Sequence, residues 1–450
     1  MRLSQNIQIN LRSQTRKLIS RMWSPLCGLD QQIGFLMRSH HEPRFMIAGA
    51  QLAGVHVLRG LDEPPPGSYH IGGSGVYLDE ALIRTLGETV ERYSQLMSEV
   101  SGNHTIVYAS YDEMRDRDEL IIDASHLRFY PDRYYDRPGF PFQRFAPDAL
   151  LGWIKVPSLI HRGRELWVPA QLLLVGYLPK HHDGEPWLLA SMTTGSAAHT
   201  APLLALRNAL MEIVQIDSTM GHWYSPAVAP RIVFDERTQA MENLINRLFG
   251  SGQPRPKFFW LRNPDLPGFT VACQIRQAPQ RVPVVGTGLG GDLVLSGAMY
   301  KALLEAVGVI QLAKLELMTY SFNEDGVSID PQNIYDLDRN VAYYAQAGKQ
   351  EILDHKFSDA KTVRASDLPP DIKGSPAEDV RLIVNSFAKS QKELVFMNLT
   401  TPDIAQLGFT AVRVWSAETL SLCVPSAPPV QHQRFQTYGG VTNEEPHPYP

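Results

Sequence analysis

The stretch GGSGVYLDEALIRTLGETVERYSQ, residues 72–95, joins a run of small residues directly to a helical pattern and decides the fold. On a helix, positions i, i+4 and i+7 lie on one narrow stripe, which here carries Arg84, Glu88 and Glu91. The broad opposite face is apolar and is expected to pack on the core; it comprises Leu82, Leu86, Val90, Tyr93 and Met97. The stretch therefore predicts a helix that buries one side and presents a charged stripe on the other.

The same arrangement recurs further along the chain. The helical segment 201–216 carries Asn208, Glu212 and Gln215 at the same spacing, and segment 297–318 carries a weaker copy with Lys301, Glu305 and Gly308. Small residues precede both segments, as TTGSAA (193–198) and GTGLGG (286–291). Chance could produce one such pairing, but the pattern favours a strand–glycine loop–helix unit repeated around one shared site.

The polar stripes lie within otherwise apolar helices, which bears on the ligand that they could hold. A partly buried carboxylate is costly unless it is paired or bound to a cation, and oxygen ligands suit Mg²⁺. The first glycine run lacks the lysine of a P-loop, so metal held by Glu88 and Glu91 would supply the positive charge for phosphate. The glycine loop would then contribute backbone N–H groups. Spacing alone leaves open that these glutamates are solvent-facing members of ordinary helical ion pairs.

Composition narrows the class of protein. The chain has 450 residues and a net charge of −5, with no long run of one sign, so nucleic acid and anionic membranes are not expected partners. No stretch of 18 apolar residues predicts a membrane span. The three cysteines are far apart in sequence, which favours a reducing, cytoplasmic (bacterial) location. The basic N-terminus predicts a first helix or a binding arm, with a transit peptide as the alternative.

The chain alternates short strand-like runs with helices, which predicts an α+β (mixed α/β) fold. The expected strands include 104–110, 172–178 and 231–236, and loops rich in proline and glycine are expected at 62–68, 130–147 and 262–268. We expect an N-terminal segment over 1–65, a core over 66–425 and a proline-rich tail over 426–450. The aromatic and basic stretch 128–145 could grip a peptide or another subunit, or pack on itself as a surface loop.

At this point the sequence resembles a known family, the YcaO superfamily. The segments 73–94 and 193–218 are similar to its two helix motifs, and LDRNVAYYA (337–345) and LTTPDIAQLGFTAVRVW (399–415) follow in the expected order. The terminal PHPYP (446–450) resembles the proline-rich end of members that form azoline rings. The resemblance covers roughly residues 20–450 and implies a YcaO-type ATP-binding fold around a central nucleotide site.

The resemblance also implies roles for individual residues. The metal ligands correspond to Glu88, Glu91, Glu212 and Gln215, and the residues that contact ATP correspond to Ser74, Arg84, Glu88, Arg92, Asn208, Glu212 and Arg413. Arg92 and Pro450 are the expected catalytic residues, with Pro446 and Pro448 carrying the tail toward the site. The sequence departs from the family at Gln215 (usually Glu), Ile216 (often Arg), Ser74 (often Lys) and Asn340 (often His).

The activity implied by the resemblance is an ATP- and Mg²⁺-dependent cyclodehydratase. It would convert Cys, Ser or Thr of a ribosomally made precursor peptide into thiazoline or oxazoline rings. The implied partners are that peptide, a ubiquitin-activating-like protein that binds its leader and an FMN-dependent azoline dehydrogenase, in a homo- or hetero-oligomer. The alternatives are thioamide or amidine formation, an accessory role in methylthiolation, or a non-catalytic scaffold.

Overall fold

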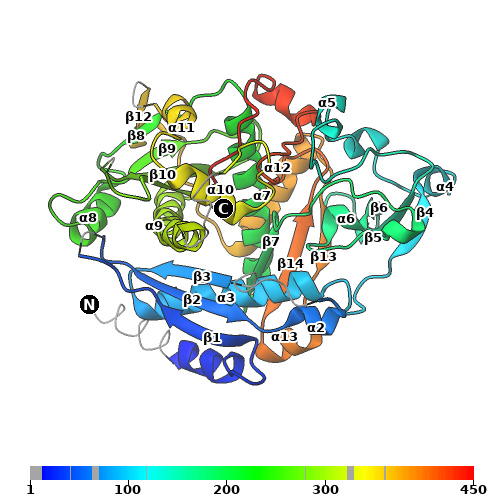
Figure 1. Cartoon of the computed structure of the whole chain (residues 1–450), viewed down its shortest axis with the longest axis horizontal. Helices are drawn as coiled ribbons and strands as arrows, with labels where there is room; N and C mark the ends of the chain where they lie inside the picture. The colour runs from blue at the N-terminus through cyan, green and yellow to red at the C-terminus, as the bar shows by residue number, and fades with distance from the viewer. Residues whose placement is uncertain are drawn as a thin grey trace.

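The computed structural model describes residues 13–450 except 41, 63–69, 118, 279, 322–328 and 359–360. Four sheets and the helices packed on them make a mixed α/β fold, as the sequence predicts (Figure 1). Most of the expected loop at 62–68 lies outside the described residues, as does the N-terminal segment up to residue 12.

The N-terminal sheet supports the first predicted helix. Its antiparallel strands run in the order β1 (Asp30–Phe35), β2 (Met46–Leu52) and β3 (His70–Gly75). Helix α3 (Leu78–Met97) packs on β2 and β3, and the short helix α2 (Val55–Arg59) packs on α3. The five apolar residues expected to face the core from α3 are all buried, so that prediction is confirmed.

The largest sheet has the strand order β11-β10-β9-β8-β12. Its strands are β8 (Arg231–Val233), β9 (Lys257–Trp260), β10 (Phe269–Arg276), β11 (Val285–Asp292) and β12 (Thr362–Arg364). Only the β12–β8 pair is parallel among the described strands of this sheet. The long helix α9 (Leu295–Ser321) packs along β10 and β11, and the neighbouring helices are α8 (Gln239–Leu248), α10 (Leu337–Ala345) and α11 (Glu351–Lys356).

Two three-stranded antiparallel sheets complete the fold. The first has the order β13-β14-β7, from Val395–Asn398, Thr410–Trp415 and Ser196–His199. It carries α7 (Pro202–Tyr224), on which α12 (Pro376–Lys389) packs, and α13 (Pro402–Leu407) connects β13 to β14. The second has the order β4-β5-β6, from Val107–Ser110, Leu150–Pro157 and Glu165–Pro169. The short helices near it are α4 (Tyr111–Arg115), α5 (Asp132–Tyr135) and α6 (Ala170–Leu173).

The predicted strand–helix unit is present three times, as β3–α3, β7–α7 and β11–α9. The expected glycine loop is wrong for the first and third units, whose small residues lie within β3 and β11. In the second unit Gly195 lies in a turn before β7, with a left-handed φ of 80°. A Cβ added at Gly288 would lie 2.1 Å from the Ala306 backbone nitrogen of α9, and one at Gly73 would lie 2.5 Å from the Thr85 nitrogen of α3. Glycine therefore lets the helix backbone approach the strand closely in these two units.

The expected strand at 172–178 is also wrong. Residues Ala170–Leu173 form helix α6, and the chain then turns at Gly176, whose φ of 72° is left-handed. The leucines 172–174 are fully buried, and a short buried apolar run cannot be assigned to strand or helix from periodicity alone. The strands expected at 104–110 and 231–236 are present in shorter form, as β4 and β8.

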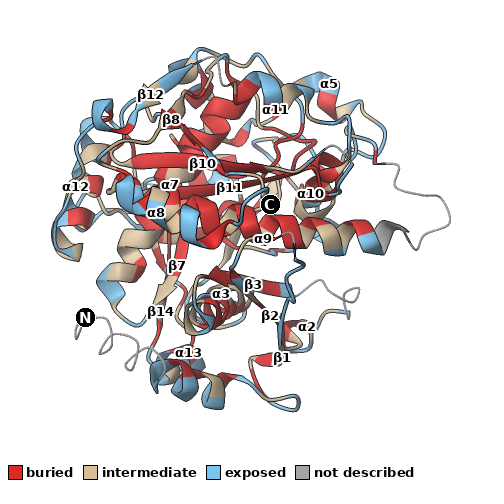
Figure 2. Ribbon diagram, turned by 90° about the vertical axis from the view of Figure 1, so that its left-hand side faces the viewer, coloured by how far each residue is buried: buried red, intermediate tan, exposed pale blue. Residues whose placement is uncertain are grey.

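Burial is highest where α7, α9, β10 and β11 meet (Figure 2). Among the described helices, one is apolar and long enough to cross a membrane, the Leu295–Met318 part of α9. Of its most apolar portion, 61% is buried inside the protein, so packing in the core accounts for its composition.

Candidate functional site

The polar stripes of α3, α7 and α9 face one another across a shared space. Each stripe interrupts a buried helix surface, and Glu88, Glu91, Glu212 and Glu305 are all half-buried. Each helix is fixed by the strand that precedes it, and α3 also contacts β7, α7 contacts β11, and α9 contacts β3. These cross-contacts join the three units around one centre.

The carboxyl groups of the stripes are close enough to repel one another. Burial raises the pKa of Glu91 well above its usual value, and the charges of Glu88 and Glu212 raise it further. The pKa of Glu212 is raised in the same way, by burial and then by Glu88 and Glu305. The pKa of Glu305 rises to about 7, mainly through burial, although the Leu289 backbone N–H opposes the shift. Four carboxylates from three helices therefore share a partly buried space that favours a bound cation.

Arg413 of β14 lies beside this cluster. Its guanidinium donates hydrogen bonds to the carbonyl oxygens of Leu173 (2.8 Å) and Met192 (2.7 Å). Burial lowers its pKa to about 10, while Glu212 and Glu91 favour its charged form. Arg413 of β14 and Ser196 of β7 are opposite each other in the strand register. The Nε of Arg413 and the hydroxyl of Ser196 are buried without a hydrogen-bond partner. These orphaned polar atoms are suited to a ligand that occupies the centre of the site.

The glutamates are not gathered at metal-ligand distance. Glu88 pairs with Arg92 at 3.2 Å, and Glu91 accepts a hydrogen bond from the side chain of Gln95 at 3.3 Å. Within the described residues, no three His, Cys, Asp or Glu side chains lie close enough to hold a metal ion. The donor set and the raised pKa values fit a hard divalent cation, for which Glu88, Glu91 and Glu212 are the candidate ligands.

The other predicted site residues lie around the same helices. Arg84 is exposed and pairs with Glu80 at 3.2 Å, one turn away from Glu88 on α3. Ser74 is buried in β3, and its hydroxyl faces α9 at Gly308, where an added Cβ would lie 3.0 Å from it. Asn208 is half-buried on α7. Gln215 lies against β11, because a Cβ at Gly291 would be 2.9 Å from its Oε1.

The C-terminal tail ends in the same part of the molecule. Tyr449 is 1% exposed, and the charge of Glu305 contributes to the raised pKa of its hydroxyl. The half-buried Pro450 follows it directly. The charge of Glu88 in turn raises the pKa of Glu305. The chain end therefore lies near the acidic centre.

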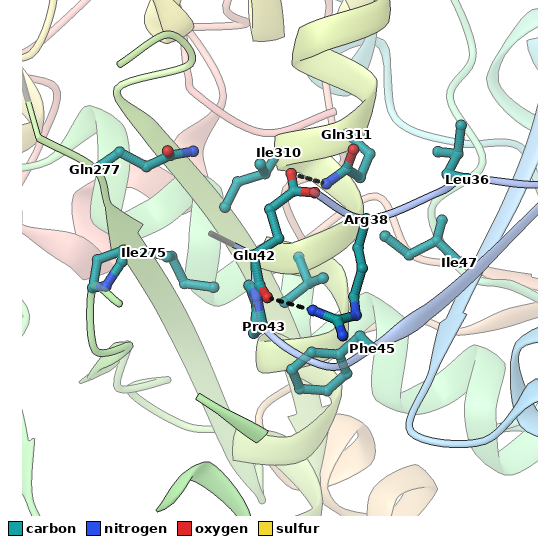
Figure 3. A pocket seen from close by; sticks show the side chains of 12 residues that line it. Leu36, Arg38, Glu42, Pro43, Phe45, Ile47, Ile275, Gln277, Ile310 and Gln311 are labelled. Carbon is teal, nitrogen blue, oxygen red and sulfur yellow. Dashed lines mark hydrogen bonds between the residues drawn. The ribbon is translucent and has the colours of Figure 1, made fainter. Parts of the chain in front are cut away.

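A separate pocket lies between α9 and the segment before β2 (Figure 3). Glu42, one of its polar residues, accepts a hydrogen bond from Gln311 at 2.6 Å and pairs with Lys314. The cavity holds about 20 Å³, which is room for a water molecule and not for a nucleotide.

Comparison with known proteins identifies the arrangement. Residues 72–419 match the family model of the YcaO cyclodehydratases, which is described as binding ATP and Mg²⁺. The chain belongs to the YcaO family. The family description thus confirms the two cofactors expected from the sequence. A search of curated protein sequences finds no match.

Solved YcaO structures share the fold at low sequence identity. A heterocyclase in complex with substrate and cofactor matches 97% of this chain with a TM-score of 0.70 and 18% identity. The match covers 57% of the heterocyclase, so this chain spans little more than half of its length. YcaO from Methanopyrus kandleri, bound with AMPPCP and Mg²⁺, matches 92% of this chain and 89% of its own, with a TM-score of 0.56 and 17% identity.

A third structural neighbour belongs to an assembly. The E. coli microcin synthetase McbBCD complex contains a chain that matches 93% of this one and 96% of its own, with a TM-score of 0.59 and 11% identity. These identities establish the shared fold. They leave the substrate of this YcaO protein to be inferred from its own site.

The structure adds three residues that the sequence-based site lacked. Glu305 belongs to the weak third stripe, and its spacing was the available signal. Ser196 lies in the second small-residue segment, where its role depends on pairing with Arg413 across two strands. Asn340 donates hydrogen bonds to carbonyl oxygens of the C-terminal tail. These positions are too far apart in sequence for a local pattern to reveal the contact.

Proposed function

We propose that this YcaO protein is an ATP- and Mg²⁺-dependent cyclodehydratase that forms thiazoline or oxazoline rings in a ribosomally made precursor peptide. The supporting observation is the convergence of carboxylates from α3, α7 and α9 beside buried, unpartnered Arg413 and Ser196 atoms. The proline-rich tail beside this centre favours ring formation over the other backbone modifications of the family.

The proposed roles come from the family resemblance. Glu88, Glu91, Glu212 and Gln215 would hold Mg²⁺, which neutralises phosphate charge when bound. Ser74, Arg84, Asn208 and Arg413 would contact the nucleotide, as would Arg92 once it is released from Glu88. The carboxylate of Pro450 would take the proton from the attacking side chain.

The reaction uses one ATP for each ring. The thiol or hydroxyl of a substrate Cys, Ser or Thr attacks the preceding carbonyl carbon, and the amide oxygen then takes the γ-phosphoryl group of ATP. ADP leaves in that transfer, and loss of the oxygen as phosphate together with the amide N–H proton then gives the azoline. Amide oxygen is a poor leaving group, and positioning and charge stabilisation in the site account for the enzyme's part.

The proposed partners come from the family resemblance. A separate ubiquitin-activating-like subunit would supply leader-peptide binding. An FMN-dependent dehydrogenase would oxidise azolines to azoles. The McbBCD neighbour is itself part of a complex with pro-MccB17 bound, which supports a multi-subunit arrangement.

The test is reconstitution with the proteins encoded by neighbouring genes. Purified protein, partner, precursor peptide, ATP and Mg²⁺ are incubated, and the peptide is analysed by mass spectrometry. We expect the peptide to lose the mass of one water for each ring, and one ADP to form for each ring. An unchanged peptide mass in the complete mixture would refute the proposal.

A non-catalytic scaffold is the second candidate, and Gln215 favours it because the amide replaces a charge of the expected metal set. Titration with labelled ATP separates the two roles. An enzyme requires Mg²⁺ for tight binding of ATP, whereas a scaffold binds ATP weakly or independently of the metal.

A further inference from the structure

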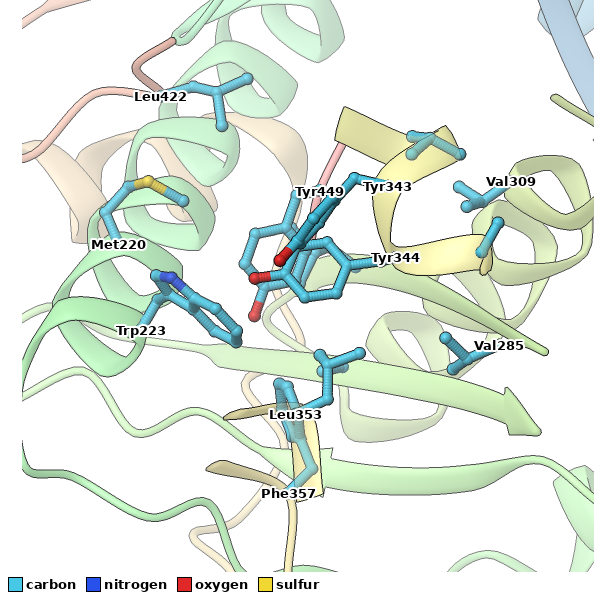
Figure 4. Packing of buried hydrophobic residues seen from close by; sticks show 14 of the residues in the cluster. Met220, Trp223, Val285, Val309, Tyr343, Tyr344, Leu353, Phe357, Leu422 and Tyr449 are labelled. Atoms are coloured by element: carbon cyan, nitrogen blue, oxygen red, sulfur yellow. The ribbon is translucent and has the colours of Figure 1, made fainter. Parts of the chain in front are cut away.

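The last residues of the chain run through the interior of the protein. Glu444 and Glu445 are exposed, the next four residues are buried, and Pro450 is half-buried. His447 and Tyr449 are 0% and 1% exposed, and their rings stack at 5.9 Å. Figure 4 shows Tyr449 packed among Trp223, Tyr343 and Tyr344. The tail is therefore held as a core element and not as a surface strand of chain.

The buried part of the tail is held through its backbone. The side-chain amide of Asn340 on α10 donates to the carbonyl oxygens of His447 and, at 3.4 Å, of Tyr449. The hydroxyl of Tyr344, also on α10, donates to the carbonyl oxygen of Pro446. The indole of Trp223 on α7 donates to the carbonyl oxygen of Glu445 at 2.8 Å. These donors fix the path of the backbone without selecting its side chains.

The entrance to this path is held by a charged contact. The carboxylate of Glu444 accepts a hydrogen bond from the hydroxyl of Tyr134 at 2.7 Å and pairs with Arg133. Both residues belong to the aromatic and basic stretch 128–145. The guanidinium of Arg137 lies 3.7 Å from the centre of the Tyr134 ring and 3.9 Å from the Glu444 carboxylate.

The stretch 128–145 is rigid enough to serve as an anchor. Its rings pack on one another: Tyr130 stacks on Phe142 at 5.4 Å and contacts Phe140 edge-on at 5.2 Å. Tyr134 is 0% exposed, so its hydroxyl has a fixed direction toward Glu444. Of the two sequence-based interpretations, packing of the stretch on its own aromatic rings is thus confirmed. The polar groups of the stretch hold the C-terminal tail.

We propose that Tyr134 and Arg133 latch Glu444 and that Asn340 holds the backbone beyond it, so that these positioning residues set where Pro450 lies in the site. The proposal rests on the proposed function for the catalytic part of Pro450, but the latch itself is a statement about the tail. Asn340 stands where relatives often carry histidine, and here its amide is the donor that meets the two tail carbonyls.

The chain offers matched variants for the test. Glu444→Gln removes the charge at the latch, and Glu445→Gln makes the same change at the adjacent exposed residue, whose side chain makes no contact with Tyr134 or Arg133 among the described interactions. Tyr134→Phe removes the hydroxyl and keeps the buried ring, and Tyr135→Phe is its neighbouring control. The double variant Tyr134→Phe/Glu444→Gln measures whether the two changes act through one contact.

Amide hydrogen exchange over residues 442–449, read by mass spectrometry, reports the seating of the tail in the full chain without any assay of activity. We expect about tenfold faster exchange in Glu444→Gln and Tyr134→Phe, the factor for losing one hydrogen bond to a charged group. The double variant should add little, and both controls should match the wild type. Equal exchange in Glu444→Gln and Glu445→Gln would overturn the latch.

The kinetic measurement uses the reconstituted complex. A positioning role predicts a lower kcat for ring formation with an unchanged Kd for Mg·ATP in the latch variants. An equal loss in the Glu445→Gln control would overturn this role. If the wild type forms no ring, the proposed function fails, while hydrogen exchange still decides the latch.

Discussion

Glu88 is the residue whose charge acts on the other three carboxylates of the site. It raises the pKa values of its neighbours on α3, α7 and α9, yet it is itself partly exposed and paired with Arg92. An exposed helical ion pair contributes little to folding. The cost of bringing the carboxylates together therefore has its explanation in ligand binding and not in stability.

We predict that Glu88→Gln lowers ring formation about 100-fold, the usual cost of removing one electrostatic group from an active site. The free energy of unfolding should not fall, because the side chain is outside the core and its charge opposes the charges of three neighbouring carboxylates. Activity assays and urea unfolding check the two parts. Glu351→Gln, an exposed change on α11, is the control. Retained activity would remove Glu88 from the site.

Asp30 gives the protein a pH-dependent stability that is separate from catalysis. It is buried in β1 and accepts a hydrogen bond from Thr89 at 2.7 Å. Burial raises its pKa from 3.8 to about 6, against the smaller effect of that hydrogen bond. The folded protein thus keeps a proton that the unfolded chain loses above pH 3.8, so Asp30 favours folding at low pH, and this contribution is lost as the pH rises to about 6.

Asp30→Asn should remove this dependence. Relative to the variant, the wild type should lose on the order of 2–3 kcal/mol of unfolding free energy between about pH 4 and pH 7. Urea unfolding of both proteins across this range measures the difference. Parallel pH profiles for the two proteins would show that Asp30 does not carry the effect.

At the scale of elements, the contact between a glycine strand and a helix is what sets the geometry of the site. In β11, Cβ atoms added at Gly286, Gly288 and Gly290 would all meet α9 at 2.4 Å or less. The helix therefore lies as close to the strand as its backbone allows. This closeness places Glu305 at the centre.

Gly288→Ala should destabilise the protein by about 3 kcal/mol or more, because the Cβ would overlap the backbone of α9. Gly34→Ala in the exposed strand β1 is the control, since an added Cβ meets nothing within 4 Å. Urea unfolding should separate the two variants clearly. Comparable stabilities would show that α9 can shift away from β11 without cost.

The elements also show how far the sequence could lead. Helical spacing predicts the helix α7, and it predicts α3 together with the side that α3 buries, because that information is local. The same spacing indicates the two polar stripes, whose roles at the site stay predictions. The glycines of 72–75 and 286–291 indicate loops, because a strand that packs against a helix backbone has the same local sequence as a turn. Ser196 and Asn340 depend on partners far away in the chain, which no local spacing encodes.

At the scale of the whole molecule, the tail links the core to the site. Tyr449 belongs to the main hydrophobic cluster together with Trp223 and Tyr344, whereas Pro450 is half-buried at its end. We therefore expect stability and catalysis to depend on different residues of the same short segment.

Removing Pro450 alone should abolish ring formation and leave the free energy of unfolding nearly unchanged. Removing residues 446–450 should lower the free energy of unfolding by a further ~3–5 kcal/mol, because loss of the buried Tyr449 ring leaves a cavity. Thermal or urea unfolding and the peptide mass assay measure the two effects. A stable protein after the longer deletion would contradict the burial of the tail.

The distance in sequence between the tail and its anchors has a consequence for folding. Each strand–helix unit of the site is local, so β3–α3 and β11–α9 can form without closing a long loop. Tyr134 and Glu444 are 310 residues apart, and Asn340 and His447 are 107 apart. Loop closure of that length is paid for late in folding. We therefore expect the local strand–helix units to form early, and the contacts of the chain end, which need distant segments to be in place, to form late.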